Sequence, residues 1–236
     1  GASAHAPENT LSSFHLALSH HEYAIEFDVQ LTRDHQVIVF HDRTLDRTTN
    51  GKGPVSKQSW SEIQSLNAGA AYGSAFRGER IPSLAQVLDQ FSSSLLYNIE
   101  LKEYSSPWGI LPIKVINLVQ AKGLEAAVLL SSFNPFTILE THKLSSSIQK
   151  GYIIHGLPLL IWFQLGIAAL LPVDSVHLSA NFLKPSILRI LRSMDKKVFF
   201  YTLNHPGEIK KALSLKIDGF FTDDPALARR TITEMN

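Results

Sequence analysis

Short hydrophobic runs rich in β-branched residues alternate with stretches of helical periodicity along most of the chain. The runs predict strands and the intervening stretches predict helices, because side chains repeat with a period of two in strands and 3.6 in helices. The alternation favours an α/β fold built around a parallel sheet. The predicted strands are 24–30, 36–41, 95–101, 127–133, 150–154, 175–178, 198–203 and 219–222. The predicted helices are 10–20, 83–91, 110–122, 135–144, 185–194 and 207–215.

The first two predicted strands, 24–30 and 36–41, form an antiparallel hairpin in our interpretation. Only a short turn around Arg33 and Asp34 separates them, whereas a parallel crossover needs about a dozen residues or more. Apart from the second hairpin strand, seven predicted strands remain, and a TIM (β/α)8 barrel has eight parallel strands. We therefore predict a TIM barrel whose first strand lies upstream of Gly1.

The stretch at about 42–82 is rich in turn-forming residues and is longer than an ordinary connection. Glycine and proline gather at 50–54, and further glycines follow at 69–78. We predict that this stretch is an insertion after the hairpin, which extends over the barrel mouth and shapes the substrate pocket. The chain, 1–236, is then a single barrel domain with one insertion.

Residues 157–171 form a strongly apolar stretch in which only Gln164 is polar. The stretch is shorter than the roughly 20 residues of a membrane-spanning helix, and Pro158 and Gly166 interrupt it. We therefore expect a buried or half-buried helix that packs on the barrel. The alternative is an apolar lip that touches a membrane or a lipid tail.

Composition narrows the classes of function. With 22 Lys and Arg against 21 Asp and Glu, the formal charge of +1 provides no basic field of the kind that binds nucleic acid. The absence of cysteine excludes a disulfide framework and thiolate metal sites. The first residues carry no basic run followed by an apolar stretch, as a signal peptide would. These features lead us to expect a cytoplasmic protein.

Acidic side chains share one face of two predicted strands. Glu26 and Asp28 are two residues apart, so they point the same way, and Glu100 follows the same pattern with Asn98 in a later strand. On a surface strand such acids are a solvated face, but in a barrel lumen they repel each other unless a cation binds between them. Carboxylates without cysteine suit a hard ion, Mg²⁺ or Ca²⁺, better than zinc.

Two cationic or titratable residues are predicted beside these acids. Lys102 lies one step beyond Glu100 on the same face, where it either pairs with a phosphate oxygen or simply neutralises Glu100. In the predicted hairpin, Asp28 falls opposite Phe40 or His41, which places His41 near the acids. A histidine beside a carboxylate site is a candidate general acid or base.

Nine blocks of the sequence resemble, in the same order, the motifs of the glycerophosphodiester phosphodiesterase family. The blocks are A-P-E-N-T at 6–10 with F at 14, E-F-D-V-Q at 26–30, F-H-D at 40–42, L-D-R-T-T-N-G at 45–51, E-R-I-P-S-L at 79–84, N-I-E-L-K at 98–102, S-S-F at 131–133, Y-T-L-N at 201–204 and T-D-D-P at 222–225. The resemblance implies a PLC-like phosphodiesterase TIM barrel. It also implies hydrolysis of glycerophosphodiesters to sn-glycerol 3-phosphate and an alcohol with the help of a divalent cation, Mg²⁺ or Ca²⁺.

The resemblance assigns the metal and acid–base roles. Glu26, Asp28 and Glu100 would hold the cation, and His41 would be one of two acid–base histidines. The first family motif begins His-Arg-Gly, and this sequence begins at that glycine, so the partner histidine and the phosphate-binding arginine are expected just upstream of Gly1. One histidine would take a proton from the nucleophile, and the other would protonate the leaving alcohol.

The resemblance also assigns residues to the substrate. Lys102 would contact the phosphate, while Phe133 and Tyr201 would line the glycerol side. Glu8 would brace the site from behind, and Asn9 would cap the first helix. Tyr201 replaces the usual tryptophan, which keeps an aromatic wall and adds a hydroxyl, so an altered preference with retained activity is expected.

Two other functions stay open at this point. A lysophospholipase D would cut a lipid-tailed diester through the same site, with the apolar stretch 157–171 as its support. A non-catalytic phosphodiester-binding protein would lack the upstream histidine. In each case the expected partner is a small phosphodiester. Contact with a membrane through 157–171 is possible but is not the favoured expectation.

Overall fold

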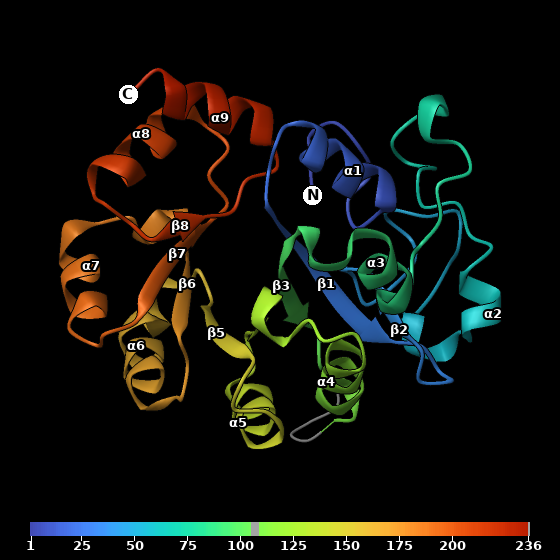
Figure 1. Cartoon of the computed structure of the whole chain (residues 1–236), viewed down its shortest axis with the longest axis horizontal. Coiled ribbons are helices and arrows are strands. Elements are labelled where there is room, and N and C mark those ends of the chain that lie inside the picture. The colour runs from blue at the N-terminus through green and yellow to red at the C-terminus, as the bar shows by residue number, and fades with distance from the viewer. Residues whose placement is uncertain (105–108, 236) are drawn as a thin grey trace.

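The predicted strands form one sheet that curls round, with the helices on its outside (Figure 1). A computed structural model describes residues 1–104 and 109–235. The strands are β1 (Ala24–Leu31), β2 (Val37–Val39), β3 (Leu96–Leu101), β4 (Val128–Ser132), β5 (Gln149–Ile154), β6 (Ser175–Ser179), β7 (Lys197–Tyr201) and β8 (Gly219–Phe220). Their order in the sheet is β2-β1-β3-β4-β5-β6-β7-β8, and all neighbours except β1 and β2 pair in parallel. The α/β class and the parallel sheet are therefore confirmed.

Helices follow the strands as the periodicity predicted. They are α1 (Leu11–Ser19), α2 (Trp60–Ile63), α3 (Leu84–Phe91), α4 (Leu111–Ala121), α5 (Pro135–Leu144), α6 (Ile161–Leu170), α7 (Pro185–Arg192), α8 (Pro206–Ser214) and α9 (Pro225–Thr233). A proline in the first turn starts several of them, because its missing N–H has no partner to lose at that position. The apolar faces of α1, α3 and α4 join one core cluster with β1 and β3, and those of α6 to α8 join a second cluster with β5 to β7.

The hairpin between β1 and β2 is confirmed. Val29 pairs with Val39 in antiparallel register, and the backbone N–H of Phe40 donates to the carbonyl oxygen of Asp28 at 2.9 Å. Phe40 therefore lies opposite Asp28, as predicted, and the next residue, His41, emerges at the end of the strands that carries the acids.

The curled sheet has β2 and β8 at its edges, and the beginning of the described chain lies between β1 and β8. The amino group of Gly1 donates to the carbonyl oxygen of Glu26 at 3.2 Å, and the N–H of Ala4 donates to that of Asp223 at 3.0 Å. These bonds tie the first residues to β1 and to the segment that follows β8, and β1 and β8 are not paired with each other in the described residues. The upstream strand stays a prediction.

The segment 42–82 builds a small core of its own beside β2. Its members are mostly aliphatic side chains that are almost inaccessible: Ile38, Phe40, Leu45, Val55, Ile63, Ala68 and Ile81. The segment contains α2 and two short 3-10 helices, Val55–Lys57 and Ser74–Phe76. A hollow of about 530 Å³ lies between this segment and α1, with Trp60, Phe76 and Arg77 among its lining residues.

The apolar stretch 157–171 consists of a 3-10 turn, Pro158–Leu160, followed by α6. One side of α6 is buried through Ile161, Leu165 and Ala168. Other side chains, including those of Trp162 and Phe163, are exposed. This agrees with the predicted half-buried helix. Among the described residues, no helix combines the length and the apolar character needed to cross a bilayer.

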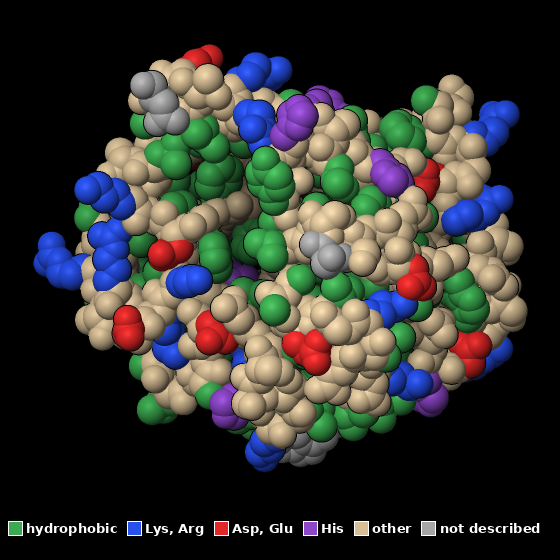
Figure 2. Space-filling model, viewed as in Figure 1, with side chains coloured by type: hydrophobic (Ala, Val, Ile, Leu, Met, Phe, Trp, Pro, Cys, Tyr) green, Lys and Arg blue, Asp and Glu red, His purple; other side chains and the backbone are tan. Residues whose placement is uncertain are grey.

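Charges of both signs are spread over the molecular surface shown in Figure 2, without a continuous area of one sign. The middle of this face is hollowed, and hydrophobic side chains border the hollow. The mixture of charges on this face agrees with the near balance of acidic and basic residues in the sequence.

Candidate functional site

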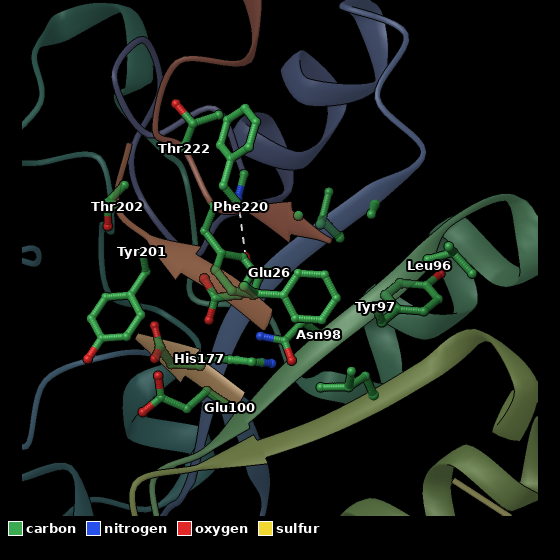
Figure 3. Close-up of a pocket in the computed structure, with 18 of the residues that line it drawn as sticks. Glu26, Leu96, Tyr97, Asn98, Glu100, His177, Tyr201, Thr202, Phe220 and Thr222 are labelled. Atoms are coloured by element: carbon green, nitrogen blue, oxygen red, sulfur yellow. Dashed lines mark hydrogen bonds between the residues drawn. The ribbon is translucent and has the colours of Figure 1, made fainter. Parts of the chain in front are cut away.

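Three carboxylates meet where β1 and β3 lie side by side. The parallel register places Glu26 beside Asn98 and Asp28 beside Glu100, and alternation along each strand turns all four side chains to the inside of the curled sheet. One carboxylate oxygen from each acid lies within 4.8 Å of the other two. Figure 3 shows Glu26, Asn98 and Glu100 directed into the same cavity. The predicted convergence of Glu26, Asp28 and Glu100 is therefore present.

Burial and mutual repulsion disfavour the charged forms of these acids. Burial, then Asp28 and then Glu100 raise the pKa of Glu26 well above its ordinary value. Burial and Asp28 also raise the pKa of Glu100 to about 7, against the opposite influence of Lys102. A set of carboxylates that resists ionisation is stabilised by any cation that binds among them, because the cation removes the repulsion.

The donor set fits a hard divalent ion. It consists of oxygen atoms, as Mg²⁺ and Ca²⁺ prefer. In addition, the side-chain oxygen of Asn98 is buried without a hydrogen-bond partner, although it lies beside Glu26 in the register. A buried acceptor of this kind costs free energy unless a donor or a cation reaches it. The site is thus a possible acidic metal site.

Lys102 supplies the positive charge at this cluster. Its Nζ lies 2.5 Å from Glu100 Oε1 and 3.1 Å from Asp28 Oδ1, and its side chain is only 11% exposed. Burial lowers the pKa of Lys102, but Asp28 and Glu100 raise it by more, so the amine stays charged. Of the two roles predicted for Lys102, neutralisation of Glu100 is the one present in this arrangement.

Asn9 holds Asp28, a contact that the sequence analysis did not predict. Its Nδ2 donates to Asp28 Oδ2 at 3.0 Å, and its Oδ1 accepts from the backbone N–H of Asp28 at 3.2 Å. The predicted cap role of Asn9 is wrong, because the side chain of Thr10 caps α1 by accepting from the N–H of Ser13. Asn9 adopts a positive φ of 58°, which asparagine tolerates better than most residues. This backbone conformation accompanies its side-chain contact with β1.

His41 is the first member of a chain of hydrogen-bonded side chains. Its Nδ1 is 2.6 Å from Asp42 Oδ1, and Asp42 is bound by Arg47 at 2.6 and 2.9 Å. Arg47 in turn donates two bonds of 2.7 Å to Glu8. The hydrogen bond from Arg47, and then that from His41, lower the pKa of Asp42 to about 2, against the effect of burial.

This series of hydrogen bonds determines which ring nitrogen of His41 carries the proton. Because the ionised carboxylate of Asp42 can only accept, Nδ1 of His41 carries the proton, and Nε2 is the nitrogen that can take up or release one. Arg47 was not among the predicted site residues, although the L-D-R-T-T-N-G block contains it. Glu8 touches Arg47, which agrees with its predicted bracing role.

Aromatic rings form one wall of the site. The ring of Phe133 stacks on that of His155 at 4.3 Å and meets Tyr201 edge to face at 6.2 Å. The hydroxyl of Tyr201 donates to the carbonyl oxygen of Ile154 at 2.5 Å, and burial raises its pKa. The added hydroxyl is therefore bound to the backbone. Lys102 Nζ lies 5.7 Å from the centre of the Phe133 ring, so the wall adjoins the acids. His155 was not predicted as part of this wall.

Phe133, Tyr201 and the acids line one cavity of about 800 Å³, which is also lined by His177 of β6 (Figure 3). His177 is almost inaccessible, is hydrogen-bonded through Nε2 to Ser175 Oγ at 2.9 Å, and contacts the rings of Phe199 and Phe221. Gly151 leaves room for it, since a Cβ at that position would lie only 2.6 Å from Nε2. Burial lowers the pKa of His177 to about 3.

We expect the neutral His177 to make the fold sensitive to acid. Its pKa is depressed in the folded state, so its contribution to stability is complete above the unfolded pKa of 6.5 and is lost as the pH falls towards 3. At pH 4.5 the loss is about 3 kcal/mol. Urea unfolding at pH 7.0 and 4.5 should show that His177→Asn loses less free energy of unfolding than the wild type. Equal losses in the two proteins would contradict this assignment.

Residues 1–227 match the glycerophosphoryl diester phosphodiesterase family. A glycerophosphodiester phosphodiesterase from Caldanaerobacter subterraneus subsp. tengcongensis is 31% identical over 226 residues, which cover 95% of this chain and 92% of the relative. One from Bacillus altitudinis is 30% identical over 237 residues, covering 97% of this chain and 94% of the relative.

The fold has similar solved structures. A phosphodiesterase from Oleispira antarctica, in complex with the product sn-glycerol-3-phosphate, superimposes with a TM-score of 0.89 and 28% identity, covering 99% of this chain and 94% of the other. A glycerophosphodiester phosphodiesterase from Agrobacterium tumefaciens gives a TM-score of 0.84 at 27% identity, covering 98% of this chain and 96% of the other. Together with the sequence match and the acid cluster, these similarities establish that the chain belongs to the glycerophosphoryl diester phosphodiesterase family.

Proposed function

We propose that the protein hydrolyses glycerophosphodiesters to sn-glycerol 3-phosphate and an alcohol. The observation that carries the proposal is the meeting of Glu26, Asp28 and Glu100 in one cavity with His41, in a chain of this family. The Oleispira antarctica relative, which was solved with sn-glycerol-3-phosphate, supports the same substrate class.

A divalent cation would be held by the oxygen atoms of Glu26, Asp28 and Glu100, and we propose Mg²⁺ or Ca²⁺ because neither thiolate nor a cluster of histidines is present among these donors. Such an ion, when bound, acts as a Lewis acid on a phosphate oxygen. Asn9 fixes one carboxylate oxygen of Asp28, so it limits the directions from which Asp28 can coordinate.

His41 moves a proton in this proposal. The Nδ1–H group stays hydrogen-bonded to Asp42, and Nε2 exchanges a proton with the nucleophile or with the leaving alcohol. Arg47 and Glu8 hold Asp42 in position, because Arg47 bridges the two carboxylates with short, charge-assisted bonds. In this role Glu8 acts through Arg47 and does not itself contact the substrate.

The other predicted residues bind the substrate. Lys102 would pair with a phosphate oxygen of the substrate, since its long side chain can turn towards it from Glu100 and Asp28. Phe133 and Tyr201 line the glycerol side as a rigid apolar wall. The segment 42–82 contributes Arg47 and borders the mouth.

The test is the release of glycerol 3-phosphate from a panel of diesters, including glycerophosphocholine and glycerophosphoethanolamine. The full-length protein is stripped with a chelator and then given Mg²⁺ or Ca²⁺ at equal concentration. We expect no release after stripping and restored release with at least one ion. Release that continues unchanged in excess chelator would contradict the metal role, and no release under any condition would contradict the proposed activity.

A lysophospholipase D is the second candidate. The specific observation in its favour is the group of exposed apolar side chains around Trp162 and Phe163, which follow β5 on the side of the cavity. Turnover of lysophosphatidylcholine compared with that of glycerophosphocholine separates the two activities. A preference for the lipid-tailed diester would favour this candidate.

A further inference from the structure

Five large apolar side chains are exposed within seven consecutive residues after β5. We call this group the apolar rim; its members are Leu157, Leu159, Leu160, Trp162 and Phe163. Leu159 is 95% exposed, Phe163 69% and Trp162 62%. Single exposed apolar residues are common, but a contiguous group of this kind marks an interaction surface.

The apolar rim adjoins the candidate active site through the chain itself. His155, which stacks on Phe133 in the aromatic wall, precedes Leu157 by two residues. The rim therefore begins where the wall ends, at the carboxyl ends of the parallel strands. These ends are where barrels of this kind carry their active sites.

The apolar rim is held in place by buried neighbours. Pro158 starts the 3-10 turn, and Ile161 and Leu165 anchor the following helix in the core, at 4% and 2% exposure. The exposed side chains thus stand on an ordered turn whose other side is packed. Their exposure is a property of this turn and helix, because burying Ile161 and Leu165 turns Trp162 and Phe163 outwards.

The stretch of sequence that holds the apolar rim carries no negative charge. Between Glu140 and Asp174 there is no acidic residue, and the charged residue nearest the rim in sequence, Lys150, is itself buried. A stretch of exposed apolar side chains without an acidic residue suits a layer of lipid headgroups that carries phosphate, because no carboxylate repels the phosphates.

We propose that the apolar rim docks on a lipid surface and presents the mouth of the cavity to it. Tryptophan, phenylalanine and leucine are the residues that enter the boundary between headgroups and acyl chains, and tryptophan is favoured at that depth. A second copy of the chain fits less well, because a stable interface between proteins needs about 20–30 residues on each side.

Docking on a lipid surface would also place a lipid-tailed substrate at the cavity, and this part of the inference rests on the proposed function. A diester whose alcohol bears an acyl chain lies in the lipid surface, with its phosphate at headgroup level. A rim inserted beside the cavity brings that phosphate towards Lys102 without complete extraction of the lipid into water. Docking itself needs no catalysis, so it can be measured separately.

The test is sedimentation of the full-length protein with vesicles of phosphatidylcholine alone and of phosphatidylcholine with about 30% phosphatidylglycerol. Leu159→Glu combined with Phe163→Glu is the test variant. Leu170→Glu is the matched control, because Leu170 is 88% exposed at the opposite end of α6. We expect the wild type and the control to sediment with vesicles, and the test variant to lose at least about ten-fold in vesicle affinity.

Two further measurements complete the test. The emission of Trp162 should shift to the blue on adding vesicles, and Trp162→Phe should remove most of that shift while vesicle binding stays. Turnover of glycerophosphocholine should be equal in the wild type and the test variant, so a failure of docking is distinguished from a failure of the proposed activity. The proposal is overturned if the wild type does not sediment, if Leu170→Glu weakens sedimentation equally, or if light scattering shows a dimer that only the test variant abolishes.

Discussion

Replacing His41 with alanine is expected to lower kcat for glycerophosphodiester hydrolysis by about 10²–10⁴-fold, the usual contribution of a general acid or base. The reason is the position of Nε2, which is free to exchange a proton because Asp42 holds the proton on Nδ1. His41 is half exposed, so the substitution leaves no large cavity and should have little effect on folding. Steady-state kinetics with glycerophosphocholine and a thermal unfolding curve provide the two measurements.

His142→Ala is the matched control for this experiment, since His142 is an exposed histidine in the last turn of α5. We expect wild-type kcat in the control. Arg47→Ala should lie between the two, because it leaves His41 in place but removes the arginine that fixes Asp42. An unimpaired His41→Ala variant would refute the acid–base role.

Replacing Glu100 with glutamine is expected to change activity and stability in opposite directions. Turnover should fall by at least about 10²-fold, because a ligand of the proposed cation is lost. The metal-free protein should become more stable at pH 8. Glutamine resembles the protonated acid, so it avoids the cost of ionising Glu100 beside Asp28 in a buried place.

The sign of the stability effect follows from the pKa of Glu100, which is about 7 in the folded protein and 4.5 as the reference value. A raised pKa means that the contribution of the group to stability is complete below pH 4.5 and is lost as the pH rises through 7. At pH 8 the loss amounts to about 3 kcal/mol, and Glu100→Gln should recover up to that amount.

Urea unfolding in excess chelator, at pH 4.5 and pH 8 for both proteins, measures this effect. The gain of the variant should appear at pH 8 and largely vanish at pH 4.5. Asp89→Asn is a suitable control, because Asp89 is an exposed acid on α3 that pairs with Lys122 far from the cavity. A variant that is less stable than the wild type at pH 8, and equally active, would speak against both the repulsion and the metal role.

Local patterns were sufficient to predict the positions of the main site residues. The two-residue spacing of Glu26 and Asp28 placed them on one face, and the short turn before β2 placed Phe40 opposite Asp28. Both rules depend on geometry within a strand or a hairpin, which the sequence determines directly. The predicted strands agree with the structure to within a few residues for the same reason.

Contacts between distant segments could not be predicted in the same way. Asn9 was expected to cap α1, since asparagine favours caps, but its φ of 58° directs the side chain to Asp28. Arg47 was overlooked because its partners, Glu8 and Asp42, are 39 and 5 residues away and come from different loops. The helix α9 was not predicted, although Asp224 and Pro225 form a proper start for it.

The bridge that Arg47 makes between Glu8 and Asp42 has a consequence for how this protein can diversify. One arginine links the segment 42–82 to the loop before α1, while His41 follows the second strand of the hairpin. Loops beyond that link can lengthen, shorten or change their chemistry without disturbing proton transfer. The residues that transfer the proton are therefore separate from the loops that can change to accept a different alcohol.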